Sequence, residues 1–136
     1  MLMNKRILIT GANGFIGSNI IYELLANSTP VTALVREKSN IDYLKKIKCY
    51  NIIQTDNYLD PIVIRKLSMS KPEYIVHCAW SNNQLKDTKN LIKILELAKN
   101  INCKGFITIG SYKEYGQLEK NLSEDTICIQ IGRAHV

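Results

Sequence analysis

Three glycines at fixed spacing are the residues of this sequence best suited to binding a phosphate. Gly11, Gly14 and Gly17 follow a short apolar run that ends at Thr10, in the stretch KRILITGANGFIGS. A phosphate can reach the N–H groups at the start of a helix only where no side chain covers them. Gly11 is expected to reverse the chain, Gly14 to let a pyrophosphate approach the backbone, and Gly17 to let a helix lie close to a sheet. The stretch therefore predicts a strand, a dinucleotide-binding turn and a helix.

Histidine and cysteine are the next candidates for chemistry, but their spacing favours structural roles. His77 lies inside the nearly unbroken apolar run YIVHCAW and has no partner at metal-ligand spacing. A lone histidine in a buried strand is typically a hydrogen-bonded core residue, and we prefer this interpretation to catalysis or metal binding. The cysteines lie too far apart for a CxxC motif, so we interpret them as reduced thiols and predict no metal site. They are Cys49, Cys78, Cys103 and Cys128.

Strand and helix patterns alternate along the chain and must position these residues. Short apolar or β-branched runs predict strands at 7–9, 31–35, 49–54, 74–80 and 105–110, with helices after the glycine turn and at 39–48, 60–68 and 85–100. In the last helix one face is predicted from Leu85, Thr88, Leu91, Leu95 and Ala98. The fold class is α/β, a doubly wound parallel sheet of Rossmann type in strand order 3-2-1-4-5, because crossovers are right-handed and the winding reverses between strands one and four. The strand carboxyl ends then meet at one edge.

The end of the second predicted strand bears on which dinucleotide binds. In a βαβ unit of this kind an acidic residue there binds the ribose diol of NAD, whereas an arginine accommodates the 2′-phosphate of NADP. Val35 and Arg36 occupy that place, and Lys38 and Ser39 follow. The pattern favours NADP over NAD. The alternative is that Arg36 is a solvated loop residue.

Several motifs resemble those of one known family. The stretch TGANGFIG resembles the TGxxGxxG signature of the extended short-chain dehydrogenase/reductase family, which comprises nucleotide-sugar epimerases, dehydratases and reductases. HCAW at 77–80 resembles the family's HLAA motif. GSYKEYG at 110–116 resembles its SSxxVYG motif, in the form typical of nucleotide-sugar C4 reductases. The motifs occur in family order, and the resemblance extends over residues 4–130.

The resemblance implies an NAD(P) site and a catalytic serine. Ser111 takes the place of the catalytic Ser/Thr, whose hydroxyl would bond the reacting oxygen of the substrate, unless it only caps a strand end. Asp56 would contact the adenine, or it simply begins a turn. Ala79 and Trp80 would border the nicotinamide half. The implied cofactor-binding residues are Gly11, Asn13, Gly14, Phe15, Ile16, Gly17, Arg36, Asp56, Ala79 and Trp80.

The overall composition is that of one globular domain. The 136 residues are 46% hydrophobic and 22% charged, which suffices for a core. The net charge of +6 comes from basic residues in no run longer than a pair, which argues against nucleic acid as a partner. No apolar stretch approaches the ~20 residues that cross a bilayer, and no signal-peptide core follows MLMNKR. We therefore expect a cytoplasmic protein with no membrane partner.

The carboxyl-terminal end bears on domain organisation and activity. The family's catalytic YxxxK does not follow residues 117–130, and the final IGRAHV matches a translated sequencing adapter. We therefore assign residues 1–130 to the NAD(P)-binding domain and 131–136 to a non-native tail. The sheet is expected to be truncated before its last strands and the substrate domain.

The function implied is hydride transfer between a nicotinamide and a carbon of a nucleotide-linked sugar. The fragment itself is expected to be inactive, because the Tyr and Lys of the family's acid/base chemistry are missing. A nucleotide sugar is the expected substrate of the complete protein, and a homodimer is one possible assembly of it. The alternative is a non-catalytic NAD(P)-binding sensor or interaction module of the same fold.

Overall fold

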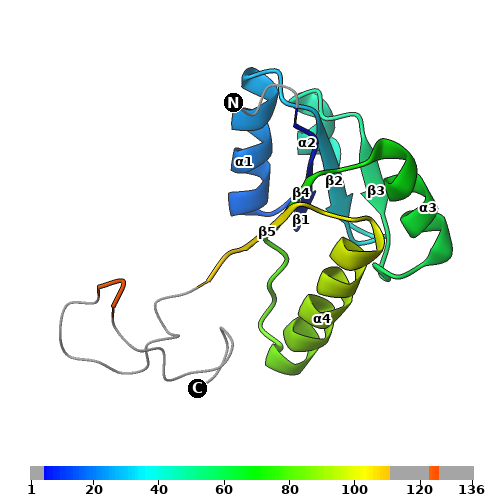
Figure 1. The fold of residues 1–136 in the computed structure, drawn as a ribbon. Helices are drawn as coiled ribbons and strands as arrows, with labels where there is room; N and C mark the ends of the chain where they lie inside the picture. Colours follow the sequence, from blue (N-terminus) through cyan, green and yellow to red (C-terminus); the bar gives the residue numbers. More distant parts are fainter. Residues whose placement is uncertain (1–4, 111–122, 126–136) are drawn as a thin grey trace.

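A parallel sheet forms the centre of the molecule (Figure 1). The computed structural model describes residues 5–110 and 123–125. In this part of the chain five parallel strands lie in the order β3-β2-β1-β4-β5, which confirms the predicted fold class and strand order. The strands are β1 (Ile7–Thr10), β2 (Val31–Val35), β3 (Ile52–Gln54), β4 (Tyr74–His77) and β5 (Gly105–Thr108). The helices are α1 (Phe15–Ala26), α2 (Asp42–Lys46), α3 (Pro61–Ser70) and α4 (Gln84–Asn100).

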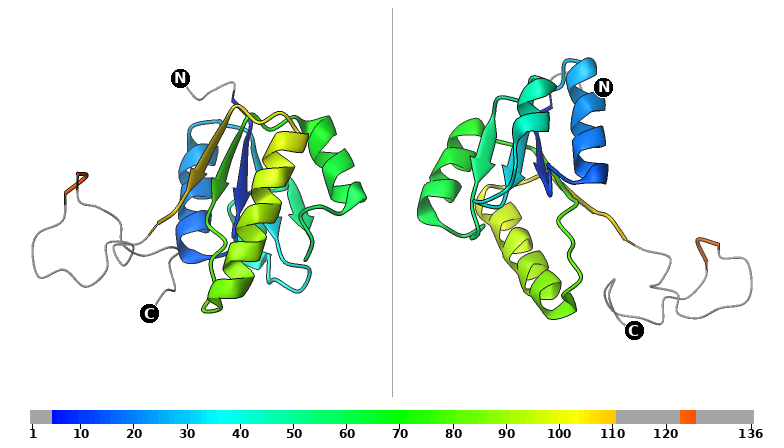
Figure 2. Two further views of the ribbon diagram at one scale, coloured as in Figure 1. Left: turned by 60° about the horizontal axis from the view of Figure 1, so that its bottom comes forward. Right: turned by 180° about the vertical axis from the view of Figure 1, so that it is seen from behind.

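The helices cover the two faces of the sheet in pairs (Figure 2). Successive side chains of a strand point to opposite faces. In β1, Ile7 and Ile9 belong to the core shared with α1 and α2, whereas Leu8 belongs to the core shared with α3 and α4. Both faces of β1 are therefore buried, which explains why its sequence ILIT shows no alternation of polar and apolar residues.

The ends of α3 follow the capping chemistry of its sequence. The Asp60 side chain accepts the N–H of Ile62 at 2.8 Å, and Pro61 takes the first helical position, as the Asp-Pro pair predicts. The helix then runs past the predicted end at 68 to Ser70. Lys71 closes it in the left-handed conformation, with φ of 50°.

Strands β3, β4 and β5 are shorter than predicted, and so is α2. Apolar runs report burial, and burial continues where the hydrogen-bonded ladder has ended. Cys49, for example, is 1% exposed but precedes the first residue of β3. The predicted elements are therefore present and in the right order, with bounds that follow hydrogen bonding more closely than hydrophobicity.

The face of α4 that meets the sheet agrees only in part with the predicted one. Leu91 and Ala98 pack against the core, as predicted. Ile94 and Leu97 are fully buried, whereas Leu85 and Leu95 are 66% and 47% exposed. One cause lies in the first turn, where the carboxylate of Asp87 is buried and turned toward the loop after β4. Residues 87, 94 and 97 share one side of a helix, so the contact of Asp87 and the packing of Ile94 and Leu97 hold α4 in the same rotation.

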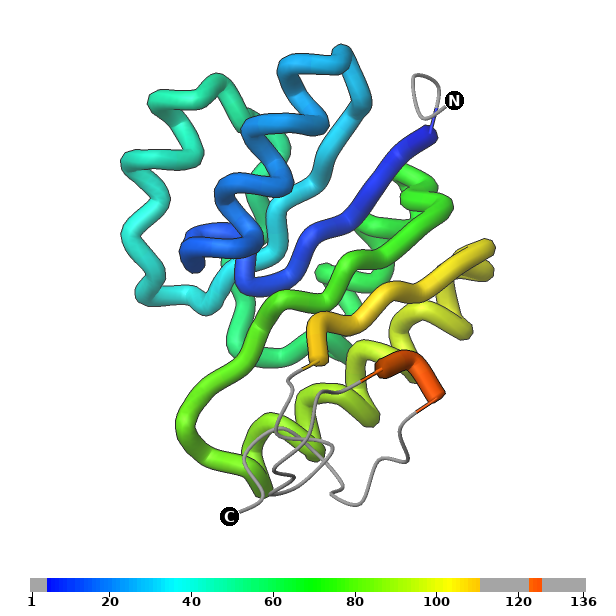
Figure 3. The backbone as a smooth tube through the Cα atoms, turned by 90° about the vertical axis from the view of Figure 1, so that its left-hand side faces the viewer, coloured from blue at the N-terminus to red at the C-terminus, as the bar shows by residue number. Residues whose placement is uncertain are grey.

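The carboxyl ends of the strands gather at one edge of the sheet. Figure 3 shows β1, β4 and β5 side by side, and β2 pairs with the other side of β1. The chain winds in opposite directions on the two sides of β1, which is where ligands bind in sheets of this type. Among the described residues, no helix combines the length and the apolar character needed to cross a membrane.

Candidate functional site

The turn after β1 is shaped by Gly11. Its φ of +61° lies in the left-handed region, and its carbonyl accepts the N–H of Gly14 at 3.0 Å. A Cβ on Gly11 would lie 2.6 Å from the carbonyl oxygen of Cys78 and 2.7 Å from the nitrogen of Ala79. Gly11 therefore reverses the chain, as predicted, and also lets the turn press against the end of β4.

Gly14 and Gly17 have different surroundings. A Cβ on Gly17 would overlap the carbonyl oxygen of Gly11. The close contact of Gly17 is therefore with the turn, whereas the prediction was a close contact with the sheet. A Cβ on Gly14 would meet only that same oxygen, at 3.3 Å. Gly14 is the N-cap of α1 and offers no side-chain cap, whereas Asp60 and Asn83 cap α3 and α4. The first N–H groups of α1 therefore remain for another acceptor.

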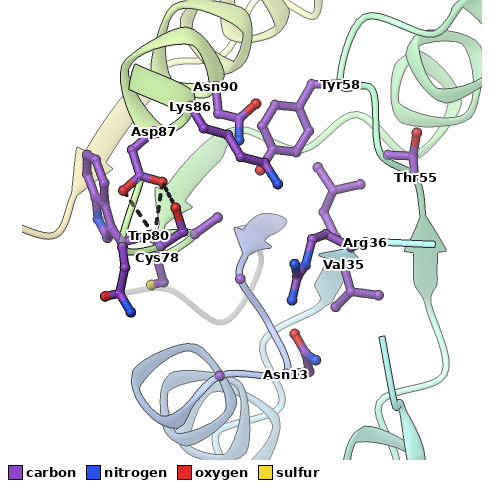
Figure 4. A pocket seen from close by; sticks show the side chains of 16 residues that line it. Asn13, Val35, Arg36, Thr55, Tyr58, Cys78, Trp80, Lys86, Asp87 and Asn90 are labelled. Carbon is purple, nitrogen blue, oxygen red and sulfur yellow. Dashed lines mark hydrogen bonds between the residues drawn. The ribbon is translucent and has the colours of Figure 1, made fainter. Parts of the chain in front are cut away.

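A cleft of about 490 Å³ lies in front of this turn (Figure 4). Its walls come from the ends of β1, β2 and β4 and from the first turns of α4. Of the predicted site residues it brings together Gly11, Asn13, Gly14, Arg36, Ala79 and Trp80.

Three other predicted cofactor-binding residues lie elsewhere. Asp56 lines a second hollow of about 400 Å³, which shares Arg36 with the cleft. The side chains of Phe15 and Ile16 lie on another surface of α1, together with Ile20. The prediction for Phe15 and Ile16 therefore rests on their backbone N–H groups alone.

A buried polar pair lies between β1 and β4. Thr10 and His77 are register partners, and Oγ1 of Thr10 lies 2.6 Å from Nδ1 of His77. Because Oγ1 also accepts the N–H of Cys78 at 3.2 Å, we assign its hydroxyl as the donor to Nδ1, which leaves the imidazole proton on Nε2. Burial lowers the pKa of His77 to about 4, with the nearby charge of Asp87 acting in the opposite direction. His77 is thus a neutral, hydrogen-bonded core residue, as predicted.

Aromatic rings enclose the rest of the His77 imidazole. The ring centroids of Trp80, Phe106 and Tyr58 lie 5.3, 6.1 and 6.5 Å from that of His77. Within the described part of the chain, Nε2 of His77 is buried and has no hydrogen-bond partner, and the same holds for Nε1 of Trp80. With Nδ1 occupied and Nε2 protonated, the imidazole has no free lone pair for a metal or for a proton at neutral pH.

Asp87 is a residue of the cleft that sequence reasoning missed. It is 4% exposed, and its Oδ1 accepts both the hydroxyl of Ser81 at 2.7 Å and the N–H of Ser81 at 2.9 Å. These bonds tie the loop after β4 to the first turn of α4. Burial, with a smaller contribution from Asp87, raises the pKa of Tyr58 to about 12. The available signal was an acid in the first turn of a predicted helix, where a carboxylate is favoured.

The second hollow is bordered mainly by cations. The charged residues that line it are Arg36, Lys38, Asp56 and Lys86. Asp56 Oδ1 accepts the N–H of Glu37 at 3.1 Å, which joins the end of β3 to the loop after β2. The hydroxyl of Ser39 is buried there and has no hydrogen-bond partner among the described residues. An unpaired hydroxyl beside several cations is suited to an anion such as a phosphate.

Comparison with known families agrees with this arrangement. The family model described as "NAD dependent epimerase/dehydratase family" matches residues 7–131, which is most of the chain. The chain belongs to this family. Its membership confirms the resemblance seen in the glycine, HCAW and GSYKEYG motifs. No curated protein sequence matches the chain.

Solved structures with a similar fold include sugar-nucleotide enzymes. UDP-glucose-4-epimerase from Stenotrophomonas maltophila, with bound NAD and formylated UDP-arabinopyranose, has a TM-score of 0.78 and 17% identity over 97% of this chain and 44% of its own. dTDP-glucose 4,6-dehydratase from Bacillus anthracis, in complex with NAD, has a TM-score of 0.75 and 21% identity over 96% of this chain and 46% of its own. ADP-L-glycero-D-manno-heptose-6-epimerase from Helicobacter pylori has a TM-score of 0.64 and 24% identity over 92% of this chain and 45% of its own. This epimerase/dehydratase-family chain therefore spans less than half the length of these structures.

The remaining sequence candidates of this family member add no further site. Ser111 and Cys128 lie outside the described residues. Cys49, Cys78 and Cys103 are free, and burial raises the pKa of each thiol, so that they are protonated at neutral pH. In the ranges 5–110 and 123–125, no group of three or more metal-binding side chains gathers.

Proposed function

We propose that this chain is the dinucleotide-binding part of an enzyme that moves a hydride to or from a carbon of a nucleotide-linked sugar. The observation that carries the proposal is the uncapped start of α1 at Gly14, which opens into the cleft at the carboxyl edge of the sheet. A helix start of this kind suits a pyrophosphate. Family membership supports the substrate class, and two of the similar structures hold NAD, one of them with a UDP-sugar.

We propose NADP as the preferred cofactor. The ligands of the similar structures are NAD, so the preference rests on residues of this chain. β2 ends at Val35 with Arg36 after it, where an acid would favour NAD. Arg36, Lys38 and the unpaired hydroxyl of Ser39 line the second hollow. A 2′-phosphate in that hollow would meet the cations Arg36, Lys38 and Lys86 and, in the hydroxyl of Ser39, a donor with no other partner among the described residues.

In the complete enzyme we assign a separate role to each of these residues. The dinucleotide, when bound, supplies or accepts the hydride. The first turn of α1 holds the pyrophosphate, and Ala79 and Trp80 border the nicotinamide half. Ser111 hydrogen-bonds the reacting oxygen of the sugar and holds it in position for proton transfer. His77 takes no part, because its imidazole is buried, neutral at pH 7 and bonded to Thr10.

Titration calorimetry with NADPH and NADH tests the proposal on this chain. We expect NADPH to bind more tightly, and Arg36→Ala to remove the difference while NADH binding persists. Arg65→Ala is the matched control, because Arg65 is exposed on α3 and lines neither hollow. Failure of the wild type to bind either dinucleotide would refute the proposed function. Equal affinities that Arg36→Ala leaves unchanged would refute only the preference for NADP.

A further inference from the structure

Lys86 enters the cleft from the wall opposite the glycine turn. It lies in the first turn of α4 and lines both hollows, as does Asn90 one turn later. Figure 4 shows the side chains of Lys86 and Arg36 extending into the same space, one from α4 and the other from the end of β2. Two elements on different sides of β1 thus direct positive charge to one place.

The position of Lys86 is fixed by its neighbours in the chain. Its backbone N–H donates to Oδ1 of the N-cap residue Asn83 at 3.0 Å. The next residue, Asp87, is buried and bonded to Ser81. The start and the rotation of α4 are both held by these contacts, so the helix holds Lys86 at the cleft before any ligand arrives.

Positive charge from two sources converges on the cleft around Lys86. The N-terminal end of a helix carries partial positive charge, and Arg36 adds a like charge across the cleft. Among the described residues, neither Lys86 nor Arg36 forms an ion pair. The two carboxylates that line the hollows are engaged elsewhere, Asp56 with a backbone N–H and Asp87 with the loop after β4. An anion between the two side chains would be attracted to both cations.

We propose that Lys86 binds a phosphate of the dinucleotide from the α4 wall of the cleft. The inference rests on the proposed function and adds a residue on a wall that the strand-turn-helix motif does not include. Lys86 borders both hollows, so its partner is the pyrophosphate or the 2′-phosphate, and an ammonium serves either one.

Titration of Lys86→Gln with NADPH and NADH tests this role. We expect affinity to fall about tenfold or more, the usual effect of removing a hydrogen bond to a charged group. Lys89→Gln is the matched control, because Lys89 is exposed on the same helix and lines neither hollow. A loss with both dinucleotides assigns Lys86 to the pyrophosphate, and a loss with NADPH alone assigns it to the 2′-phosphate. A soluble fusion partner keeps the chain in solution, and circular dichroism checks its fold.

The outcomes separate this inference from the proposed function. If Lys86→Gln bound each dinucleotide as tightly as Lys89→Gln and the wild type do, the role of Lys86 would be overturned and the proposed function would stand. A wild type that bound neither dinucleotide would overturn both. Lys86→Arg keeps the charge and should retain affinity within a few-fold. A loss as large as that of Lys86→Gln would contradict an electrostatic role.

Discussion

Replacing Gly14 by valine should abolish dinucleotide binding without unfolding the domain. Gly14 has φ of −79° and ψ of 175°, a conformation that any residue adopts. An added Cβ would lie 3.3 Å from the carbonyl oxygen of Gly11, a close contact that a shift of a few tenths of an ångström would relieve. We expect the free energy of unfolding to change by less than about 1 kcal/mol.

The loss of affinity follows from the N–H groups that the branched side chain would cover. A hydrogen bond from a backbone N–H to a phosphate is charge-assisted and contributes about 1.5–3 kcal/mol. Covering two such groups at the start of α1 would cost about 3–6 kcal/mol, which raises Kd at least about 100-fold.

Gly17→Ala is the matched comparison. Its Cβ would overlap the carbonyl oxygen of Gly11 and lie 3.1 Å from Cα of Ala12, and backbone atoms cannot move aside cheaply. Overpacking of this kind costs about 1–3 kcal/mol or more, which exceeds the ~1 kcal/mol that alanine gains over glycine in a helix. Calorimetry with NADPH and urea denaturation separate the two effects. If Gly14→Val kept wild-type affinity, or unfolded as readily as Gly17→Ala, the assigned role of Gly14 would be refuted.

Four further outcomes are expected. The pKa of His77 falls from 6.5 in the unfolded chain to about 4 in the fold, so between these values mainly the unfolded chain binds the proton. The free energy of unfolding should therefore drop by about 2 kcal/mol from pH 7 to pH 5 in urea titrations, and a His77→Gln variant that showed the same drop would exclude this cause. Asp60→Ala should cost about 1 kcal/mol by removing the N-cap of α3, whereas Asp60→Asn should not. Ile107→Lys should reduce light scattering by the chain, because Ile107 is 56% exposed on β5 and a lysine there discourages pairing between chains; unchanged scattering would point to another surface. In the complete enzyme, Ser111→Ala should lower kcat by about 10²–10⁴-fold with little change in cofactor affinity, and a wild-type kcat would contradict its assignment.

The strands could be predicted because each buried run is short and apolar and helices separate the runs. Their order needed more, because right-handed crossovers permit several orders, and it followed from the dinucleotide-binding motif after the first strand and the family it resembles. The strand ends depend on the neighbouring chain. β4 stops at His77 although the apolar run reaches Trp80, because the N–H of Trp80 bonds the carbonyl of Cys78 and bends the chain away from the ladder.

The glycine turn could be predicted, but the wall formed by α4 could not. The positive φ of Gly11 and the contact of Gly14 with Gly11 lie within the turn itself, although the space beside Gly11 is also limited by Cys78 and Ala79. The direction of Lys86 depends on the rotation of α4, which Asp87 helps to hold through a contact with Ser81 that no periodicity records. Of the predicted face of α4, Leu91 and Ala98 pack against the core, whereas Leu85 and Leu95 are exposed. Tertiary packing therefore decided the part of the site that sequence patterns missed.

Gly11 cannot take up its final contacts before β4 has been synthesised. The unit formed by residues 7–35 precedes β4 in the chain, and its strands β1 and β2 pair with each other in parallel. Its glycine turn then lacks the backbone of Cys78 and Ala79, against which Gly11 lies in the finished domain. A nascent chain that ends before β4 would carry the complete phosphate-binding sequence without its geometry. Binding of the dinucleotide should therefore not appear during translation before β4 pairs with β1.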